Sequence, residues 1–242
     1  MRQKEKYMRK IGLLIVGTLF LGLIAKAQRP DLPGSLIIDF GINIWSTTPT
    51  DLTLNGFQSK SINVVYYYDL PIGDKGFTFT PGIGLSLERY SFDDDKTLTS
   101  TINSSNIRNI AVSDLNSVYS QANSFDKSKL GLHYLDIPLE FRYYTSKDNL
   151  SRGFRVALGP KIGVLYSSFT KVSYEDSAAE QRTVKDRQNI GINRFRYGIQ
   201  GRVGYGSFSV FGFYELSNKF DSAPLGGGDT RTLTFGISLA GF

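Results

Sequence analysis

Eight stretches of alternating apolar and polar residues follow one another from Ser35 to the C-terminal Phe242. Successive side chains of a β-strand point to opposite faces, so a period of two predicts strands with one apolar and one polar face. Between Phe77 and Glu88 the alternation holds for six consecutive pairs. The predicted strands cover residues 36–44, 61–69, 77–88, 135–143, 154–164, 192–203, 207–215 and 232–239.

A strand that separates lipid from a polar barrel interior must alternate in this way. The pattern therefore predicts an all-β fold, an eight-stranded antiparallel transmembrane β-barrel. The segment 207–215 is the exception, because Phe208, Val210, Phe211 and Phe213 do not share one phase. Seven strands follow directly from the alternation, and this one is inferred.

The connections between the predicted strands alternate between long and short. The long ones cover residues 46–60, 92–129, 170–190 and 217–229, and the short ones cover 70–76, 145–152 and 204–206. The short ones are rich in Gly, Pro, Asp, Asn and Ser, as tight reversals require. Outer-membrane barrels have short periplasmic turns and longer outside loops. We therefore expect a protein of the outer membrane of a gram-negative bacterium, with both termini in the periplasm.

The N-terminal segment has the features of an export signal. Five basic residues lie between Met1 and Lys10, an apolar run of 14 residues follows, and Ala25-Lys26-Ala27 has the small-x-small form of a cleavage site. The run is shorter than the roughly 20 residues that a spanning helix needs. This order predicts a cleavable signal peptide over residues 1–27 and a barrel domain over residues 28–242.

Removal of this segment changes the charge. It holds six of the 28 Lys and Arg residues and one of the 22 acidic residues, so the remaining chain carries a net charge of only about +1. The sequence pI of about 9.3 therefore gives no support for nucleic acid as a partner. The chain has no cysteine, which excludes disulfides, thiolate metal sites and thiol nucleophiles.

The polar faces of the predicted strands carry charges of both signs in equal number. They are the acids Asp39, Asp69, Glu88, Asp136, Glu140 and Glu215 and the bases Arg142, Arg155, Lys161, Arg194, Arg196 and Arg202. Eight strands enclose only enough room for side chains, and buried ions must be paired to offset desolvation. We expect a lumen filled by ion pairs, and the alternative is a selective path for ions or protons.

Aromatic residues gather in three of the predicted strands, at Tyr66, Tyr68, Tyr143, Tyr144, Phe195 and Tyr197. Tyr and Phe at both interfaces are typical of the girdles of outer-membrane barrels. The competing interpretation is that they form the core of a soluble β-sandwich.

Candidate chemistry is sparse. His133 is the only histidine and lies near Ser128 and Asp136 in the sequence, so a membrane-embedded hydrolase could use it at the barrel rim. No nucleophile motif accompanies it, and a rim residue is the simpler interpretation. The glycines 226–228 lack the following Lys of a phosphate loop, and the aspartates 93–95 lack the spacing of an EF-hand. We predict no catalytic, cofactor-binding or metal site and no enzymatic activity.

The longest connection, from Phe92 to Lys129, is polar but not uniformly so. Several residues approximate a helical stripe, namely Ile107, Ile110, Ala111, Asp114, Leu115 and Val118. The spacing predicts a short amphipathic helix that docks on a partner. The alternative is that this segment folds over the mouth of its own barrel.

Three segments carry a resemblance to a known family. Asp31-Leu32-Pro33-Gly34-Ser35 before the first strand, Pro81-Gly82-Ile83-Gly84-Leu85 in the third and Tyr134-Leu135-Asp136-Ile137-Pro138-Leu139-Glu140 in the fourth resemble the PorT family of outer-membrane β-barrels. The resemblance covers essentially the whole chain after the signal segment. It brings no catalytic, cofactor or metal-binding residues with it.

The resemblance implies a non-enzymatic part in the type IX secretion system, which exports adhesins, proteases and gliding-motility proteins across the outer membrane. The implied partners are other outer-membrane or periplasmic secretion-system proteins and the lipid bilayer. Two alternatives stay open: a generic surface barrel that binds a ligand or host factor through its extracellular loops, and a hydrolase that depends on His133.

Overall fold

The computed structural model describes residues 34–49, 52–102, 108–146, 153–187, 190–220 and 229–241. The predicted signal peptide, residues 1–27, lies outside them. The described strands are β1 (Ser35–Trp45), β2 (Lys60–Tyr67), β3 (Leu70–Ile72), β4 (Phe77–Phe92), β5 (Lys96–Ile102), β6 (Arg108–Asp114), β7 (Ala122–Tyr144), β8 (Phe154–Asp176), β9 (Gln181–Asp186), β10 (Phe195–Tyr205), β11 (Phe208–Glu215) and β12 (Thr232–Gly241). One helical turn, α2, covers Leu115–Val118.

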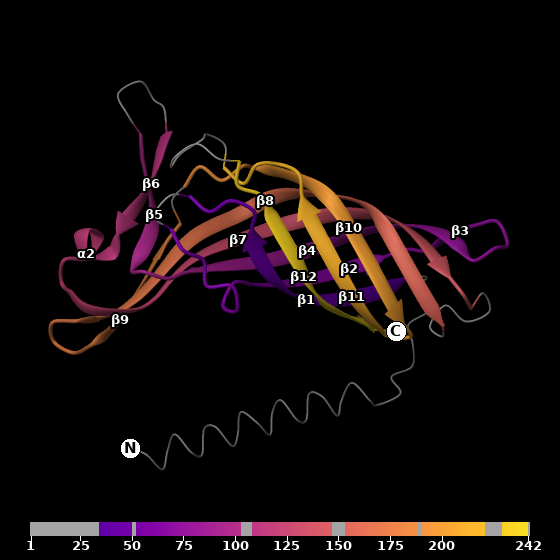
Figure 1. Ribbon diagram of the computed structural model, residues 1–242, viewed down its shortest axis with the longest axis horizontal. Helices are drawn as coiled ribbons and strands as arrows, with labels where there is room; N and C mark the ends of the chain where they lie inside the picture. Colours follow the sequence, from indigo (N-terminus) through magenta and orange to yellow (C-terminus); the bar gives the residue numbers. More distant parts are fainter. Residues whose placement is uncertain are drawn as a thin grey trace, which may run out of the picture. The chain divides into compact units, whose positions relative to one another are not determined.

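Eight of these strands close into an antiparallel barrel (Figure 1). Their order around the wall is β10, β11, β12, β1, β2, β4, β7 and β8, and pairing between β8 and β10 completes the ring. Strands β12 and β1, at the two ends of the described chain, pair from Leu36 with Gly241 to Trp45 with Thr232. The predicted eight-stranded antiparallel barrel is confirmed.

The wall presents its apolar side chains outward and its polar side chains inward. On β1, Asp39 and Asn43 are buried in the lumen while Leu36, Phe40 and Ile44 are exposed on the outer wall. The outward apolar residues form a continuous belt, and Leu158 within it is 60% exposed. This distribution is the reverse of a water-soluble barrel and fits a wall surrounded by lipid.

Strands β7 and β8 are each 23 residues long, although the alternation predicted only residues 135–143 and 154–164. At about 3.3 Å per residue they reach about 75 Å, while about 10 tilted residues cross a membrane. The remainder projects beyond the barrel, and β9 adds a third strand by pairing with β8 (Figure 1). Most of the predicted connection 170–190 is therefore strand.

The helix predicted across residues 107–118 is wrong. Within the described residues this segment forms β6, which pairs with β5 from Lys96 with Asp114 to Ile102 with Arg108. Only α2 is helical, and Asp114 caps it because its Oδ1 accepts from the backbone N–H of Asn116 at 2.9 Å. That hydrogen bond also lowers the pKa of the Asp114 carboxyl.

Other element boundaries differ in detail. The segment predicted as a strand from residue 192 begins pairing as β10 only at Phe195, and the short connection 70–76 includes β3, which pairs with β4. In the described parts of the chain, no helix is long and apolar enough to cross a membrane.

The lipid-facing belt can be tested by placing a charge at its centre. Ile83 on β4 is 54% exposed and lies midway along the outward residues of that strand. We expect Ile83→Arg to lower the free energy of unfolding by about 2–4 kcal/mol, the cost of Arg near the bilayer midplane. Urea unfolding in lipid vesicles measures it.

The matched control is Phe57→Arg. Phe57 lies in the connection between β1 and β2 and is 82% exposed, so its replacement should change the unfolding free energy little. Equal, small effects at both positions would contradict a lipid-facing outer wall.

Candidate functional site

The barrel lumen holds the densest concentration of polar chemistry in the molecule. Its buried charged residues are Asp39, Glu88, Asp136, Glu140, Glu215, Arg142, Arg155, Lys161, Arg196, Arg202 and Lys219. They come from six of the eight barrel strands and from the connection between β11 and β12. Because ions in such surroundings must be compensated, their pairing determines what the lumen can do.

Arg196, on β10, lies between two carboxylates of the facing strands. Its Nη2 is 2.7 Å from Asp136 Oδ2, and its Nη1 contacts Glu88 Oε1. The guanidinium carbon lies 3.7 Å from the centroid of the Tyr134 ring, and Lys161 Nζ approaches Asp136 Oδ2 at 3.6 Å. Both carboxylates are thus held by cations in the middle of the lumen.

Lys219 enters this cluster from the connection between β11 and β12. Its Nζ lies 2.5 Å from Glu215 Oε2 and 3.7 Å from Glu88 Oε2. Backbone hydrogen bonds to Thr230 and Asn193 hold the segment in place. A long connection therefore supplies one of the lumen's cations.

A second cluster surrounds Glu140, on β7. Arg142 Nε lies 2.7 Å from Glu140 Oε2, while Tyr67 and Gln200 donate to Oε1 at 2.9 and 2.6 Å. Arg142 also lies 3.5 Å from the partly buried Asp69. Two cross-lumen donors and Arg142 therefore contact this carboxylate.

Arg202 joins the second cluster to the opposite wall. Its Nη1 lies 2.7 Å from Asp39 Oδ1 on β1, and its Nη2 lies 3.6 Å from Glu140 Oε1 on β7. Since Arg202 is on β10, one side chain ties three strands together across the lumen. Side chains from opposite walls therefore meet across the lumen.

Aromatic rings also enter the lumen from β11, the strand whose apolar residues do not share one phase of the alternation. Phe211 and Phe213 on β11 are 4% and 1% exposed, whereas Phe208 and Val210 are exposed on the outer wall. Lys161 Nζ lies 3.7 Å from the centroid of the Phe213 ring, a cation–π contact. Both faces of β11 carry apolar side chains, and this is why its phase was ambiguous.

Glycine provides the room that the ion cluster needs. A Cβ atom at Gly163, on β8, would come within 2.2 Å of Asp136 Oδ1 and 2.8 Å of Arg196 Nε. Any side chain at this position would separate the two ionic partners. Gly163 is therefore part of the site although it carries no chemistry of its own.

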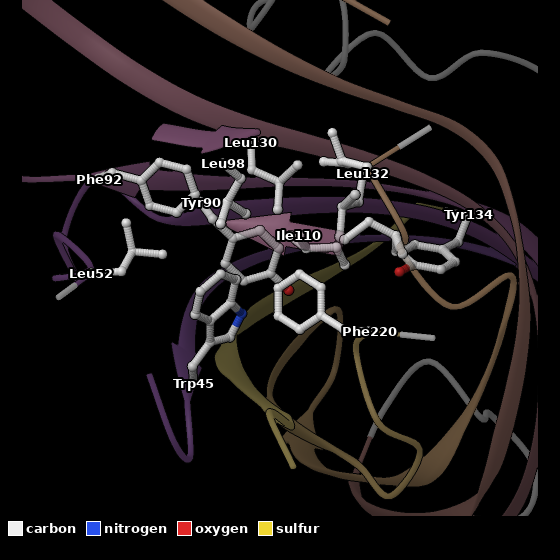
Figure 2. Packing of buried hydrophobic residues seen from close by; sticks show 12 residues of the cluster. Trp45, Leu52, Tyr90, Phe92, Leu98, Ile110, Leu130, Leu132, Tyr134 and Phe220 are labelled. Carbon is white, nitrogen blue, oxygen red and sulfur yellow. The ribbon is translucent and has the colours of Figure 1, made fainter. Parts of the chain in front are cut away.

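An apolar cap fills the lumen at the end where the long connections lie, hereafter the long-connection end. It consists of Trp45, Leu52, Tyr90, Phe92, Leu98, Ile110, Leu130, Leu132, Tyr134, Ile190, Ile192 and Phe220. Figure 2 shows the rings of Trp45, Tyr90 and Phe220 close together, with the Trp45 centroid 5.0 Å from Tyr90 and 6.0 Å from Phe220. All four long connections contribute, so they cover their own barrel.

Tyrosines join the cap to the ions beneath it. The Tyr90 hydroxyl donates to Glu88 Oε2 at 2.7 Å, while its ring packs in the cap. Tyr134 likewise belongs to the cap and lies beneath the Arg196 guanidinium. At the short-turn end, a smaller cluster of Ile37, Val65, Tyr67 and Ala240 packs inside the wall.

The lumen prediction is largely confirmed, with three changes. Eleven of the twelve predicted charges face the lumen, but Arg194 is exposed, because it lies in a bend before β10 begins. Lys219 takes the sixth basic position. Arg155 is buried but donates to Ser209 at 2.7 Å, and among the described residues it forms no ion pair.

The residues considered for catalysis are not brought together. Odd-numbered residues of this part of β7 face outward and even-numbered ones face inward, so His133 lies on the outer wall while Ser128 and Asp136 are buried inside. The His133 ring packs 5.4 Å from Phe169. The constellation considered for a hydrolase therefore does not form.

The remaining candidates from the sequence are the aspartates 93–95 and the glycines 226–228. Asp94 and Asp95 have positive φ and form the turn before β5, and Asp93 accepts from Asn55 at 3.2 Å. The glycines 226–228 lie outside the described residues. Across the described ranges, no group of three or more His, Asp or Glu side chains could hold a metal ion.

Of the predicted girdle residues, Tyr68, Tyr143, Phe195 and Tyr197 are exposed on the wall and Tyr66 is partly exposed. The prediction for Tyr144 is wrong, because its side chain is 4% exposed and its hydroxyl accepts a hydrogen bond from Arg142 Nη1 inside the lumen. Its neighbour Tyr143 takes the outward position because adjacent strand residues face opposite ways.

A family model described as "Outer membrane protein beta-barrel domain" matches residues 36–220. The match covers well over half of the 242 residues, and the chain belongs to this family of outer-membrane barrels. Its location is accordingly the outer membrane. A search of curated proteins finds no match.

The central ion cluster should contribute strongly to stability. Arg196→Met leaves Glu88 and Asp136 with their hydroxyl hydrogen bonds and longer lysine contacts but without the arginine between them. We expect a loss of about 3–5 kcal/mol in the free energy of unfolding. Denaturant titration in detergent micelles measures it. The control is Arg182→Met, which removes an exposed ion pair with Asp176. Comparable losses in the two variants would contradict this, because the buried ion pairs would then contribute no more to the free energy of unfolding than an exposed pair does.

The apolar cap gives a second test. Trp45→Ala removes the ring that contacts Tyr90, Phe92 and Phe220, and a cavity of this kind costs about 3–5 kcal/mol. Trypsin digestion should then cut the long connections faster than in the wild type. Unchanged stability and digestion would mean that the cap is not a packed core.

Proposed function

We propose that this chain is a non-enzymatic outer-membrane component of the type IX secretion system, needed for export or maturation of secreted and surface proteins. The proposal rests first on the filled lumen. Ion clusters and an apolar cap occupy the interior, and this supports a role in which the protein acts on other molecules through its outer surfaces. The PorT-like segment Asp31-Leu32-Pro33-Gly34-Ser35, with those around Pro81 and Asp136, supports the type IX system as the one to which those molecules belong.

The described surfaces suit a partner-binding role. The projecting parts of β7 and β8, together with β9, form a small sheet with its own core, in which Leu115 packs against Val172 and Tyr174. This packing supports a role in which the sheet presents one surface to another protein. In an orientation with short turns and both termini in the periplasm, this sheet lies outside the cell.

The alternative is a generic surface barrel that binds a ligand or host factor through its extracellular loops. The same projecting sheet would serve that role. The two roles differ in what happens to secreted cargo, because only a secretion component affects proteins other than its own ligand.

A gene deletion with complementation by the full-length gene tests the proposal. We expect the deletion strain to retain many cargo proteins in the periplasm, and complementation to return them to the surface and the medium. Quantitative proteomics of the three fractions measures the change.

The control is the abundance of unrelated outer-membrane barrels, which should be equal in all strains. Normal cargo export in the deletion strain would overturn the secretion role and favour a ligand-binding surface barrel. A fall of all barrels together would indicate a general envelope defect and would also contradict the proposal.

A further inference from the structure

Six basic residues lie on the outer wall at the long-connection end. They are Lys60, Arg89, Lys127, Lys129, Lys171 and Lys185, on the adjacent strands β2, β4, β7, β8 and β9. We call this set the cationic row. Five of the six side chains are exposed and that of Lys129 is partly exposed. Across four interstrand steps of about 4.8 Å, the row is about 19 Å wide.

Strand register places these like charges directly opposite one another. Lys60 pairs with Arg89, Lys129 pairs with Lys171, and Lys171 pairs with Lys185. Like charges at directly opposed positions destabilise a sheet. A fold that repeats this arrangement across three pairs carries a repulsion that a bound anion would relieve.

The row lacks acidic compensation. Within the described residues, none of its six members forms an ion pair with a carboxylate at 4 Å or less. Glu88, beside Arg89 on β4, faces the lumen and is paired there, and Asp93, just after β4, accepts a hydrogen bond from Asn55. Lys185 lies 3.8 Å from the centroid of the Phe169 ring. Phe169 itself lies across Gly131, where a Cβ would clash with its ring.

A groove on the wall joins the row to the apolar belt. The groove has a volume of ≈ 740 Å³; Lys60, Arg89, Lys127 and Lys129 line its charged part, and Phe40, Ile42, Ile62, Leu87, Phe235 and Ile237 line its apolar part. A second groove of ≈ 420 Å³ shares Arg89, Lys127 and Lys129 and continues to Lys171 and Lys185. One surface therefore offers cations above and hydrocarbon contacts below.

The row lies at the edge of the membrane. Along β4 the outward residues are apolar from Phe77 to Leu87, and Arg89 is the next outward residue. Those ten steps of about 3.3 Å, at a tilt of about 40°, give a height of about 25 Å, which matches the apolar band of such barrels. Arg89 therefore stands at headgroup level, with Lys60 directly opposite it and the other four cations on the strands that follow.

We propose that the cationic row binds the phosphate groups of a membrane glycolipid, whose acyl chains lie against the apolar part of the groove. Basic clusters at headgroup level are the recognised means of holding anionic lipids. Assignment to the outer leaflet rests on the orientation given under Proposed function, whereas the binding does not. A free anion would contact only the cations, whereas a lipid would also contact the apolar residues of the same groove.

The test uses the refolded full barrel in zwitterionic micelles and fluorescent bisphosphorylated lipid A as the probe. We expect the triple variant Arg89→Gln/Lys129→Gln/Lys171→Gln to bind about 100-fold more weakly, since each cation near a lipid surface contributes about fivefold in affinity. The same lipid without its phosphates should bind the wild type with a comparable loss. Because the variant removes like-charge repulsion, its thermal stability should not fall.

The matched control removes three cations elsewhere, in Lys75→Gln/Arg182→Gln/Arg231→Gln, and should bind as the wild type does. Equal binding by the two triple variants would overturn the proposal, as would equal binding of the dephosphorylated lipid. Displacement of the lipid by inorganic phosphate, or equally tight binding of the phosphorylated sugar without acyl chains, would identify a site for soluble anions instead. None of these results depends on cargo export, so this proposal and the secretion role can fail separately.

Discussion

The surroundings of the wall change along each strand, from hydrocarbon to water, and this change determines where every kind of side chain lies. Within the lipid belt the outward residue must be apolar, so Leu87 faces out and Glu88 faces in. One step further along β4 the order is reversed, with Arg89 outward and Tyr90 inward. The same reversal occurs on β7 between Leu135 and His133. Above this level the structure follows the rule of a soluble protein, with an apolar interior.

The ion clusters follow from the same constraint. Polar groups placed inside a narrow barrel have little water available, so they must compensate one another. Arg202 on β10 pairs with Asp39 on β1 and Glu140 on β7. Arg196 likewise joins β10 to β4 and β7. Such pairs depend on register, because a slip of one residue would turn each charge into the lipid. The buried pairs thereby favour one closed arrangement of the wall over its alternatives.

Alternation alone predicted the barrel, its strand order along the chain and most of its lumen, since these depend on local pattern. It failed where the pattern depends on distant contacts. The upper part of β8 was missed because a bulge at Tyr166 shifts its phase: His133 pairs with Ser167, but Tyr134 pairs with Leu165. Lys219 was missed because it lies in a connection, and only tertiary structure brings it to Glu215. The segment 107–118 has residues at helical spacing, yet pairing with β5 prevails over that spacing.

The same segments of the chain close the lumen and shape the outer surface. Every long connection places an apolar residue in the cap, and the same connections carry the chain to the projecting sheet and the cationic row. Tyr90 links the levels directly, since its hydroxyl contacts Glu88 and its ring packs against Trp45. Arg89, the next residue along β4, points the opposite way into the row. The inward side chains of β4 are held by the ion cluster below and the apolar cap above. The strand that presents Arg89 is therefore ordered before any lipid binds.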